Sequence, residues 1–276
     1  MESKYIVVKG IVQGVGFRPF VYKLALDNNL KGNVYNSQDG VYINIEGKKK
    51  NIDNFIFEIK NKPPKLSYIE DITIEDSSIR KYNSFNIIDS NYENNDKNKK
   101  ITLLSPDISI CEDCIKDISD IQDRRYKYPF TNCTNCGPRY SIIKNLPYDR
   151  DNTTMKNFKM CNKCKKEYEN PLNRRFHAQP ICCSECGPKL SLLDKNKNII
   201  NCENEIDTAK RILKEGNIIA IKGLGGFHLA CNAKDEKAIQ RLRNRKNRKA
   251  KPLALMMKDI DTVETYCKVN NKEREI

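Results

Sequence analysis

The sequence predicts a multi-domain protein of the α+β class, with three parts in series. Residues 1–90 show strand-like and helix-like periodicities in turn, and eight of the nine cysteines in residues 105–192 form four C-x2-C pairs. From residue 200 to residue 276 an α/β pattern returns, interrupted by a glycine-rich turn. A chain of 276 residues has room for two or three small domains, each with its own core.

The first part, residues 1–90, is predicted to be a small α/β domain. Apolar spacing predicts four strands, at 4–11, 32–36, 41–46 and 68–75, and two helices, at about 19–28 and 51–61. In the second helix, one face carries the apolar residues Ile52, Phe55, Ile56 and Ile59. The resulting order, βαββαβ, is the ferredoxin-like arrangement.

A glycine-bearing loop joins the first predicted strand to the first helix. It consists of Gln13, Gly14, Val15, Gly16, Phe17 and Arg18. Pro19 suits the first turn of a helix, so the loop leads into a helix N-terminus. Backbone N–H groups, the helix dipole and Arg18 would then all point at one anion. Most glycine loops are only turns, so the loop alone predicts little.

The loop has the sequence pattern G-x-VQGVGFR-x-F and is followed by G-x-V-x-N. With these motifs, residues 1–90 closely resemble acylphosphatase. The resemblance implies that Arg18 and the loop amides hold a phosphate, while Asn36 orients the attacking water. It implies no histidine base, and both histidines, His177 and His228, lie elsewhere in the sequence. Without Arg18, Asn36 would be interpreted as a turn-capping residue.

The cysteine pairs of residues 105–192 form a tandem repeat, because a shift of 50 residues places the first two pairs on the last two. Two C-x2-C knuckles a short loop apart supply four thiolates to a tetrahedral zinc. The predicted ligands are Cys111, Cys114, Cys133 and Cys136, then Cys161, Cys164, Cys183 and Cys186. Gly137 and Gly187 follow the second knuckles, where a positive φ is expected. The alternative is a disulfide framework or scattered buried cysteines.

Two closed sites leave no open coordination position, so both zinc ions are predicted to be structural. The 50-residue offset places Cys133 on Cys183, so Cys183 is predicted to be the ligand and Cys182 has no counterpart among the ligands of the first repeat. His177 lies near a knuckle, but four cysteines already close that site, so it is not expected to be a ligand. The alternatives for His177 are a role at a domain interface or along a substrate channel.

The residues between the knuckles suggest a function of their own. Arginines and aromatic residues inside four-cysteine modules are common in nucleic-acid binding, which is the default interpretation from residue types. However, the numbers of residues between successive cysteines (2-18-2-24-2-18-2) and the residues around them closely resemble the HypF family, the carbamoyltransferases of [NiFe] hydrogenase maturation. That family also begins with an acylphosphatase domain. The polar stretch 91–104 is predicted to be a linker between the two parts.

The last part, residues 200–276, is predicted to begin a nucleotide-binding domain. A helical stripe ends at Gly216, a short buried strand follows at 218–222, and a glycine turn leads to a helix from Asp235. In Arg241–Lys251, seven of eleven residues are basic and none is acidic, which favours a polyanionic ligand, either nucleic acid or a nucleoside triphosphate. Lys246, Arg248 and Lys251 resemble the YrdC-like fold, which implies ATP with Mg²⁺. The match covers only the start of that domain, so the domain is expected to be incomplete and loosely ordered.

Composition limits the class of protein. The net charge is +14, part of which can balance the thiolate-rich metal sites. Twelve cysteines without an export signal indicate reduced thiols and metal, hence the cytoplasm, and no apolar run suits a membrane.

The HypF resemblance implies a reaction sequence. Carbamoyl phosphate would be hydrolysed at Arg18 and Asn36, and the carbamate would pass inside the protein to the YrdC-like site, where ATP adenylates it. The zinc module would frame that path. A domain absent from this sequence would transfer the carbamoyl group to the C-terminal cysteine of the partner HypE, so this chain alone is expected only to hydrolyse acyl phosphates. The competing class is a zinc-ribbon protein that binds nucleic acid, or a tRNA-modifying relative of the YrdC group.

Overall fold

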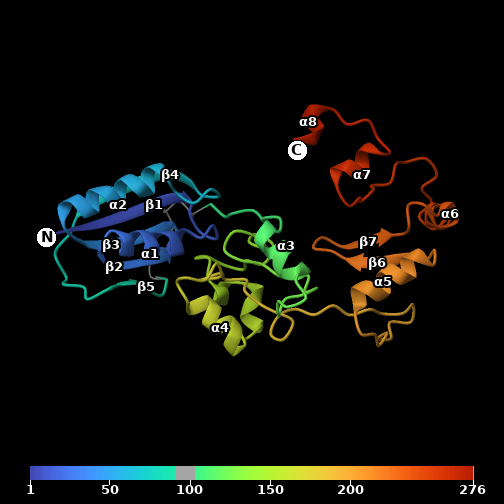
Figure 1. Ribbon diagram of the computed structural model, residues 1–276, viewed down its shortest axis with the longest axis horizontal. Helices are drawn as coiled ribbons and strands as arrows, with labels where there is room; N and C mark the ends of the chain where they lie inside the picture. Colours follow the sequence, from blue (N-terminus) through green and yellow to red (C-terminus); the bar gives the residue numbers. More distant parts are fainter. Residues whose placement is uncertain (91–102, 276) are drawn as a thin grey trace. The chain divides into compact units, whose positions relative to one another are not determined.

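A computed structural model describes residues 1–90 and 103–275 (Figure 1). The chain divides into two compact units, Met1–Lys189 and Leu190–Ile276. Most of the stretch predicted to be a linker, 91–104, lies outside the described residues. In the described parts of the chain, no helix combines the length and the apolar character needed to cross a membrane.

The N-terminal part of the first unit is a five-stranded sheet with two helices, which confirms the predicted α+β class and the βαββαβ order. The strand order is β4-β1-β3-β2-β5, with β1 antiparallel to both of its neighbours. The elements are β1 (Glu2–Ile11), α1 (Phe17–Asp27), β2 (Lys31–Ser37), β3 (Gly40–Gly47), α2 (Lys49–Asn61), β4 (Tyr68–Asp76) and β5 (Phe85–Ile87).

The strand β5 was not predicted. It has three residues and pairs in parallel with β2, where its Phe85 side chain is buried in the core. Three residues are too few to show a strand period, so only the packing of Phe85 reveals the strand.

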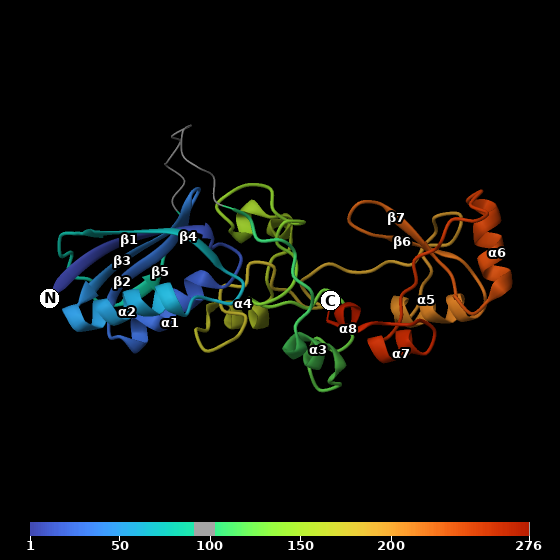
Figure 2. The ribbon, with the colours of Figure 1, turned by 90° about the horizontal axis from the view of Figure 1, so that it is seen from above.

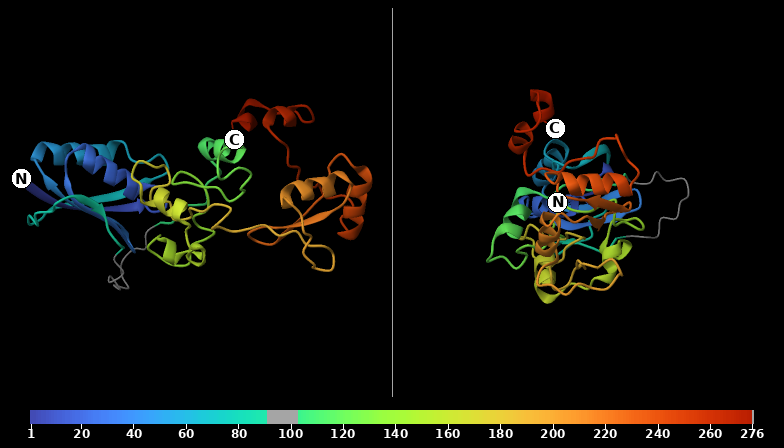
Figure 3. Two further views of the ribbon diagram at one scale, coloured as in Figure 1. Left: turned by 60° about the horizontal axis from the view of Figure 1, so that its bottom comes forward. Right: turned by 90° about the vertical axis from the view of Figure 1, so that its right-hand side faces the viewer.

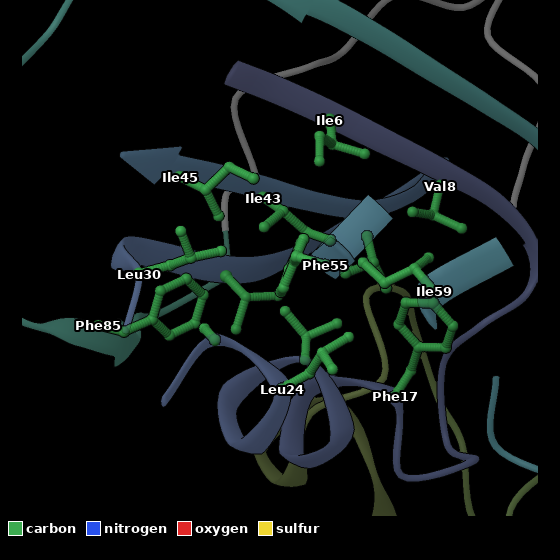
Figure 4. Packing of buried hydrophobic residues seen from close by; sticks show 14 of the residues in the cluster. Ile6, Val8, Phe17, Leu24, Leu30, Ile43, Ile45, Phe55, Ile59 and Phe85 are labelled. Atoms are coloured by element: carbon green, nitrogen blue, oxygen red, sulfur yellow. The ribbon is translucent and has the colours of Figure 1, made fainter. Parts of the chain in front are cut away.

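One core lies between the sheet and its two helices (Figure 4). Ile6 and Val8 of β1 alternate toward it, as a strand period of two residues requires. From α2, the residues Ile52, Phe55 and Ile59 point into the same core, because spacings of three and four residues share one helix face. This core fixes the ends of β1 and β2, from which the loop and Asn36 project.

The cysteine-rich part of the first unit holds little regular structure. Its two α-helices, α3 (Glu112–Ser119) and α4 (Asn162–Glu169), are offset by the same 50 residues as the sequence repeat. Each begins directly after the first cysteine of its repeat, which is its N-cap residue. Two short 3₁₀ helices, η1 (Arg150–Asn152) and η2 (Thr154–Asn157), lie between the repeats. Tyr22 of α1 contacts Phe176 of the second repeat edge to face, with ring centroids 5.4 Å apart. Figure 2 labels α1 and the helix α4 of that repeat.

The second unit contains a two-stranded antiparallel sheet and four helices among its described residues (Figure 3). They are α5 (Glu205–Lys214), β6 (Ile219–Lys222), β7 (Phe227–Ala230), α6 (Glu236–Arg245), α7 (Ile260–Glu264) and α8 (Asn271–Arg274). The strand predicted at 218–222 is present, but the prediction that it is buried is wrong, because its side chains are half-buried or exposed. A sheet of two strands cannot cover both of its own faces.

Candidate active site and metal centres

The glycine-bearing loop connects β1 to α1 and has the backbone shape expected of an anion site. Gly14 and Gly16 have φ angles of 73° and 76°, a conformation that glycine adopts without strain. Gly16 is the N-cap of α1, so the positive end of that helix faces the loop. Gln13 anchors the loop to the sheet, since its Nε2 donates to the carbonyls of Ser37 (2.7 Å) and Gly40 (3.0 Å).

Arg18 and Asn36 meet at one point, although they come from different elements. Arg18 lies in the first turn of α1 and is 8% exposed, and Asn36 lies on β2 and is 2% exposed. Arg18 Nη2 and Asn36 Nδ2 both donate to the backbone carbonyl of Tyr148, at 3.5 Å and 3.4 Å. Among the described residues, Asn36 Oδ1 is buried without a hydrogen-bond partner. The structure thus brings both sequence-predicted residues to one side of the loop and leaves an acceptor beside them.

In this structure, the charge of Arg18 is already neutralised by a carboxylate of the chain itself. Asp149 Oδ1 lies 2.7 Å from Arg18 Nη2, and Ser90 Oγ donates to the other oxygen of the same carboxylate. An anionic ligand that binds Arg18 therefore replaces an internal anion.

The cysteine-rich part supplies the second wall of this pocket, which sequence analysis did not predict. Its pocket-lining residues include Thr134, Arg139, Tyr148, His177, Gln179 and Pro180. They face the loop residues, Arg18 and Asn36. No local pattern in the sequence of residues 146–150 and 174–180 shows that they face the loop.

Two polar contacts fasten this wall to the loop. Gln13 Oε1 accepts the backbone N–H of Tyr148 at 2.8 Å, and Arg139 Nε donates to the carbonyl of Gly14. Arg150 then ties the Tyr148 segment to the second repeat, because its Nη1 donates to the carbonyls of Gln179 (2.7 Å) and Ile181 (3.0 Å). The wall is therefore a fixed part of the pocket.

His177 lies in this wall, so the fold brings it beside the phosphate loop although the two are far apart in the sequence. Burial, and then the nearby charge of Arg18, lower the pKa of His177 to about 4. The ring packs beside Tyr168 (centroids 4.9 Å apart) and against Phe176 (4.6 Å). Its Nδ1 is buried without a hydrogen-bond partner among the described residues. A neutral imidazole with free hydrogen-bonding capacity thus lines the pocket.

The eight cysteines lie in two groups of four. The first group is Cys111, Cys114, Cys133 and Cys136, and the second is Cys161, Cys164, Cys183 and Cys186, with the sulfurs of each group within 4.8 Å of one another. Sulfur pairs such as Cys111–Cys133 (3.7 Å) and Cys161–Cys183 (3.8 Å) are too far apart for disulfides, whose S–S bond is about 2.05 Å. A tetrahedron with Zn–S bonds of about 2.3 Å has S···S edges of roughly 3.8 Å. The groups form two metal-binding sites with the dimensions that zinc requires.

The arginine pairs of the two repeats cross over between the metal sites. Arg124, in the first repeat, donates to Cys164 Sγ (3.0 Å) and pairs with Glu167 Oε2 (3.0 Å) in the second. Arg174, its counterpart 50 residues later, donates to Cys114 Sγ (3.0 Å) and pairs with Asp117 in the first.

The adjacent arginines repeat this crossing. Arg125 pairs with Glu167 (2.6 Å), and Arg175 pairs with Asp117. Arg125 and Arg175 are 1% and 5% exposed. Their charge is neutralised inside the module, so these arginines do not form a surface for nucleic acid.

Two glycines and one cysteine near the second knuckles differ in their roles. Gly137 has a φ of 99°, as expected, but the expected positive φ is wrong for Gly187. Glycine is needed at 187 for space, because a Cβ there would lie 2.3 Å from Tyr128 Oη and 2.6 Å from Cys182 Cβ. Cys182 is buried outside both cysteine groups, with its Sγ 3.6 Å from Tyr128 Oη.

In the second unit, the basic run continues from α6 into a loop. Lys246 is the C-cap of α6, and both Lys246 and Lys251 are exposed. Arg248 Nη2 donates to the carbonyl of Pro252 (2.6 Å), and Arg243 Nη1 donates to the carbonyl of Lys251 (3.0 Å). The two arginines thus shape the loop, while the two lysines point their charge outward.

Three family models match this chain. The acylphosphatase model matches residues 4–87, and the HypF finger model matches residues 110–143 and 160–193. A model for the Sua5, YciO and YrdC proteins, described as "Telomere recombination", matches residues 211–276. The chain is also 50% identical over 270 residues to a probable carbamoyltransferase HypF of Methanocaldococcus jannaschii, covering 98% of this chain and 35% of the relative.

The chain belongs to the HypF family. Its structure is similar to a crystal structure of full-length HypF in a phosphate- and nucleotide-bound form, with a TM-score of 0.90 and 48% identity. That similarity covers 99% of this chain and 35% of the other. The chain thus spans about a third of the length of the HypF relatives that it matches.

The N-terminal domain alone is also similar to single-domain enzymes. An acylphosphatase of Oceanobacillus iheyensis is 40% identical over 87 residues, which cover 30% of this chain and 96% of that protein. A protein of that length has almost no residues left for a counterpart of the cysteine-rich wall. The second wall of the pocket is therefore what the HypF chain adds to an acylphosphatase domain.

Proposed function

We propose that this chain carries the carbamoyl phosphate hydrolysis site of a HypF carbamoyltransferase. The convergence of Arg18 and Asn36 on one point beside the glycine-bearing loop carries this proposal. The phosphate of the substrate binds Arg18, the N–H groups of residues 13–17 and the N-terminus of α1, and displaces Asp149 from Arg18.

The chemistry follows from the unpartnered oxygen of Asn36. Oδ1 accepts a hydrogen bond from a water and holds it toward the phosphorus atom. The water oxygen forms a bond to phosphorus, the bond between phosphorus and the carbamoyl oxygen breaks, and carbamate leaves with that electron pair. The proton of the water passes to a phosphate oxygen. Arg18 stabilises the negative charge of the transferring phosphoryl group.

Later steps belong to the whole protein. We place an acylphosphatase domain at 1–90, a linker at 91–104, the zinc module at 105–192 and the first part of a YrdC-like domain at 200–276. ATP with Mg²⁺ would bind the last of these through Lys246, Arg248 and Lys251, and would activate the carbamate as an adenylate. HypE would receive the carbamoyl group. Two structural zinc ions, one in each cysteine group, would hold the second wall of the pocket in shape.

The test is phosphate release from carbamoyl phosphate by the 276-residue chain. Arg18→Ala should lower kcat/KM by a factor on the order of 10²–10³, because it removes the fixed charge facing the phosphate. Arg80 is an exposed arginine of the same domain, so Arg80→Ala is the matched control and should leave kcat/KM unchanged. Near-normal turnover by Arg18→Ala would mean that the phosphate of the substrate binds elsewhere, and it would refute the proposal.

A further inference from the structure

The second wall of the pocket is where the acyl group of the substrate must be recognised. The loop, Arg18 and Asn36 belong to the domain shared with the Oceanobacillus acylphosphatase, so they account for the phosphate. Carbamoyl phosphate and acetyl phosphate carry the same phosphate and differ in one group, an NH₂ in place of a CH₃. A hydrogen-bond acceptor in the added wall would distinguish them, because only the NH₂ can donate.

Most polar groups of that wall already have partners. Gln179 Oε1 accepts the backbone N–H of Arg150 at 2.8 Å, and Gln179 Nε2 donates to the carbonyl of His177 at 2.9 Å. The carbonyl of Tyr148 already accepts from Arg18 and Asn36. His177 differs, since its buried Nδ1 has no partner among the described residues.

The ring of His177 is held in place without a hydrogen bond to its side chain in any described contact. Its backbone has a φ of 52°, and its N–H donates to the carbonyl of Tyr168 at 2.9 Å. Tyr168 and Phe176 flank the ring, and Gln179 holds its carbonyl. These contacts fix the ring in the pocket wall and leave its Nδ1 without a partner among the described residues.

The charge state of the ring suits an acceptor. Burial and the charge of Arg18 keep His177 neutral at neutral pH, and a neutral imidazole has one nitrogen with a free lone pair. Arg18, the loop residues and His177 line one pocket, so the phosphate position and this ring share it.

We propose that His177 accepts a hydrogen bond from the NH₂ of carbamoyl phosphate and so sets the preference of this site for carbamoyl over acetyl phosphate. This inference rests on the proposed function. His177 binds the part of the substrate that leaves as carbamate, while Arg18 and Asn36 act on the phosphorus side.

The test compares kcat/KM for the two substrates in two variants of the 276-residue chain. His177→Leu keeps bulk and removes the acceptor, and His177→Gly removes it without strain at the positive φ. In both variants, kcat/KM for carbamoyl phosphate should fall about tenfold, and that for acetyl phosphate should stay within about twofold. His177→Asn, which tolerates a positive φ and keeps an acceptor, should retain part of the preference. The exposed His228, replaced in His228→Leu, is the control and should change neither rate.

Each result has one meaning. A preference that stays at the wild-type value in both variants overturns the role of His177, and so does an equal fall for both substrates, which would indicate that the ring only packs. In both cases the wild-type chain still hydrolyses carbamoyl phosphate, so the proposed function stands. Absence of hydrolysis of either substrate by the wild-type chain would instead refute the proposed function, and this inference with it.

Discussion

Substituting Arg174 should weaken the metal site of the other repeat. Arg174 belongs to the second repeat by sequence, yet its Nη1 donates to Cys114 Sγ at 3.0 Å, in the first cysteine group. A hydrogen bond from a charged donor contributes roughly 1.5–3 kcal/mol. At 1.4 kcal/mol for each tenfold change, Arg174→Ala should therefore raise the zinc dissociation constant of the first group by about one to two orders of magnitude.

The assay isolates one group at a time. In a Cys183→Ser background only the first group keeps all four of its sulfurs, so chelator competition reports the affinity of that group alone. The mirror experiment places Arg124→Ala in a Cys133→Ser background, where the second group should weaken, because Arg124 donates to Cys164. As a control, Arg124→Ala in the Cys183→Ser background should have little effect. If each arginine affected the group of its own repeat instead, the crossed arrangement would be refuted.

Two further outcomes are expected. Metal analysis should find two zinc ions per chain, with one lost in Cys183→Ser and none in Cys182→Ser, because Cys182 lies outside both groups; release of metal by Cys182→Ser would contradict the grouping. The folded-state pKa of His177, about 4, lies below its ordinary value of 6.5, so its contribution to the free energy of unfolding is present above pH 6.5 and is lost as the pH falls toward 4. Urea titrations should show a shallower loss over that interval in His177→Asn than in the wild type, and identical slopes would rule out the buried neutral ring.

From the sequence, the features that could be predicted are those that depend on local periodicity or on the 50-residue repeat. Alternation in β1 and the three- and four-residue spacing in α2 suffice to predict these two elements and the faces that they bury. The sequence did not predict that His177 faces Arg18, because this depends on how the cysteine-rich part docks on the N-terminal domain. That docking is made by single contacts such as Tyr148 N–H to Gln13, which leave no periodic signal.

The arginine pairs show the same limit at a smaller scale. The repeat places Arg124 on Arg174, but each could bind the carboxylate of its own copy or that of the other copy. Only the structure distinguishes the two arrangements. In the same way, Gly187 resembles Gly137 in sequence position and yet is required for space rather than for a positive φ.

The crossed contacts also make each repeat depend on the other. In a symmetric dimer of identical subunits, a residue of one subunit contacts a given residue of the other, and the reverse contact follows from the two-fold axis. Arg124 with Cys164 and Arg174 with Cys114 are such a reciprocal pair, joined here within one polypeptide. The two repeats of this chain thus contact each other as the two subunits of such a dimer do. A single repeat expressed alone would then lack its arginine partners until it met a second copy of itself.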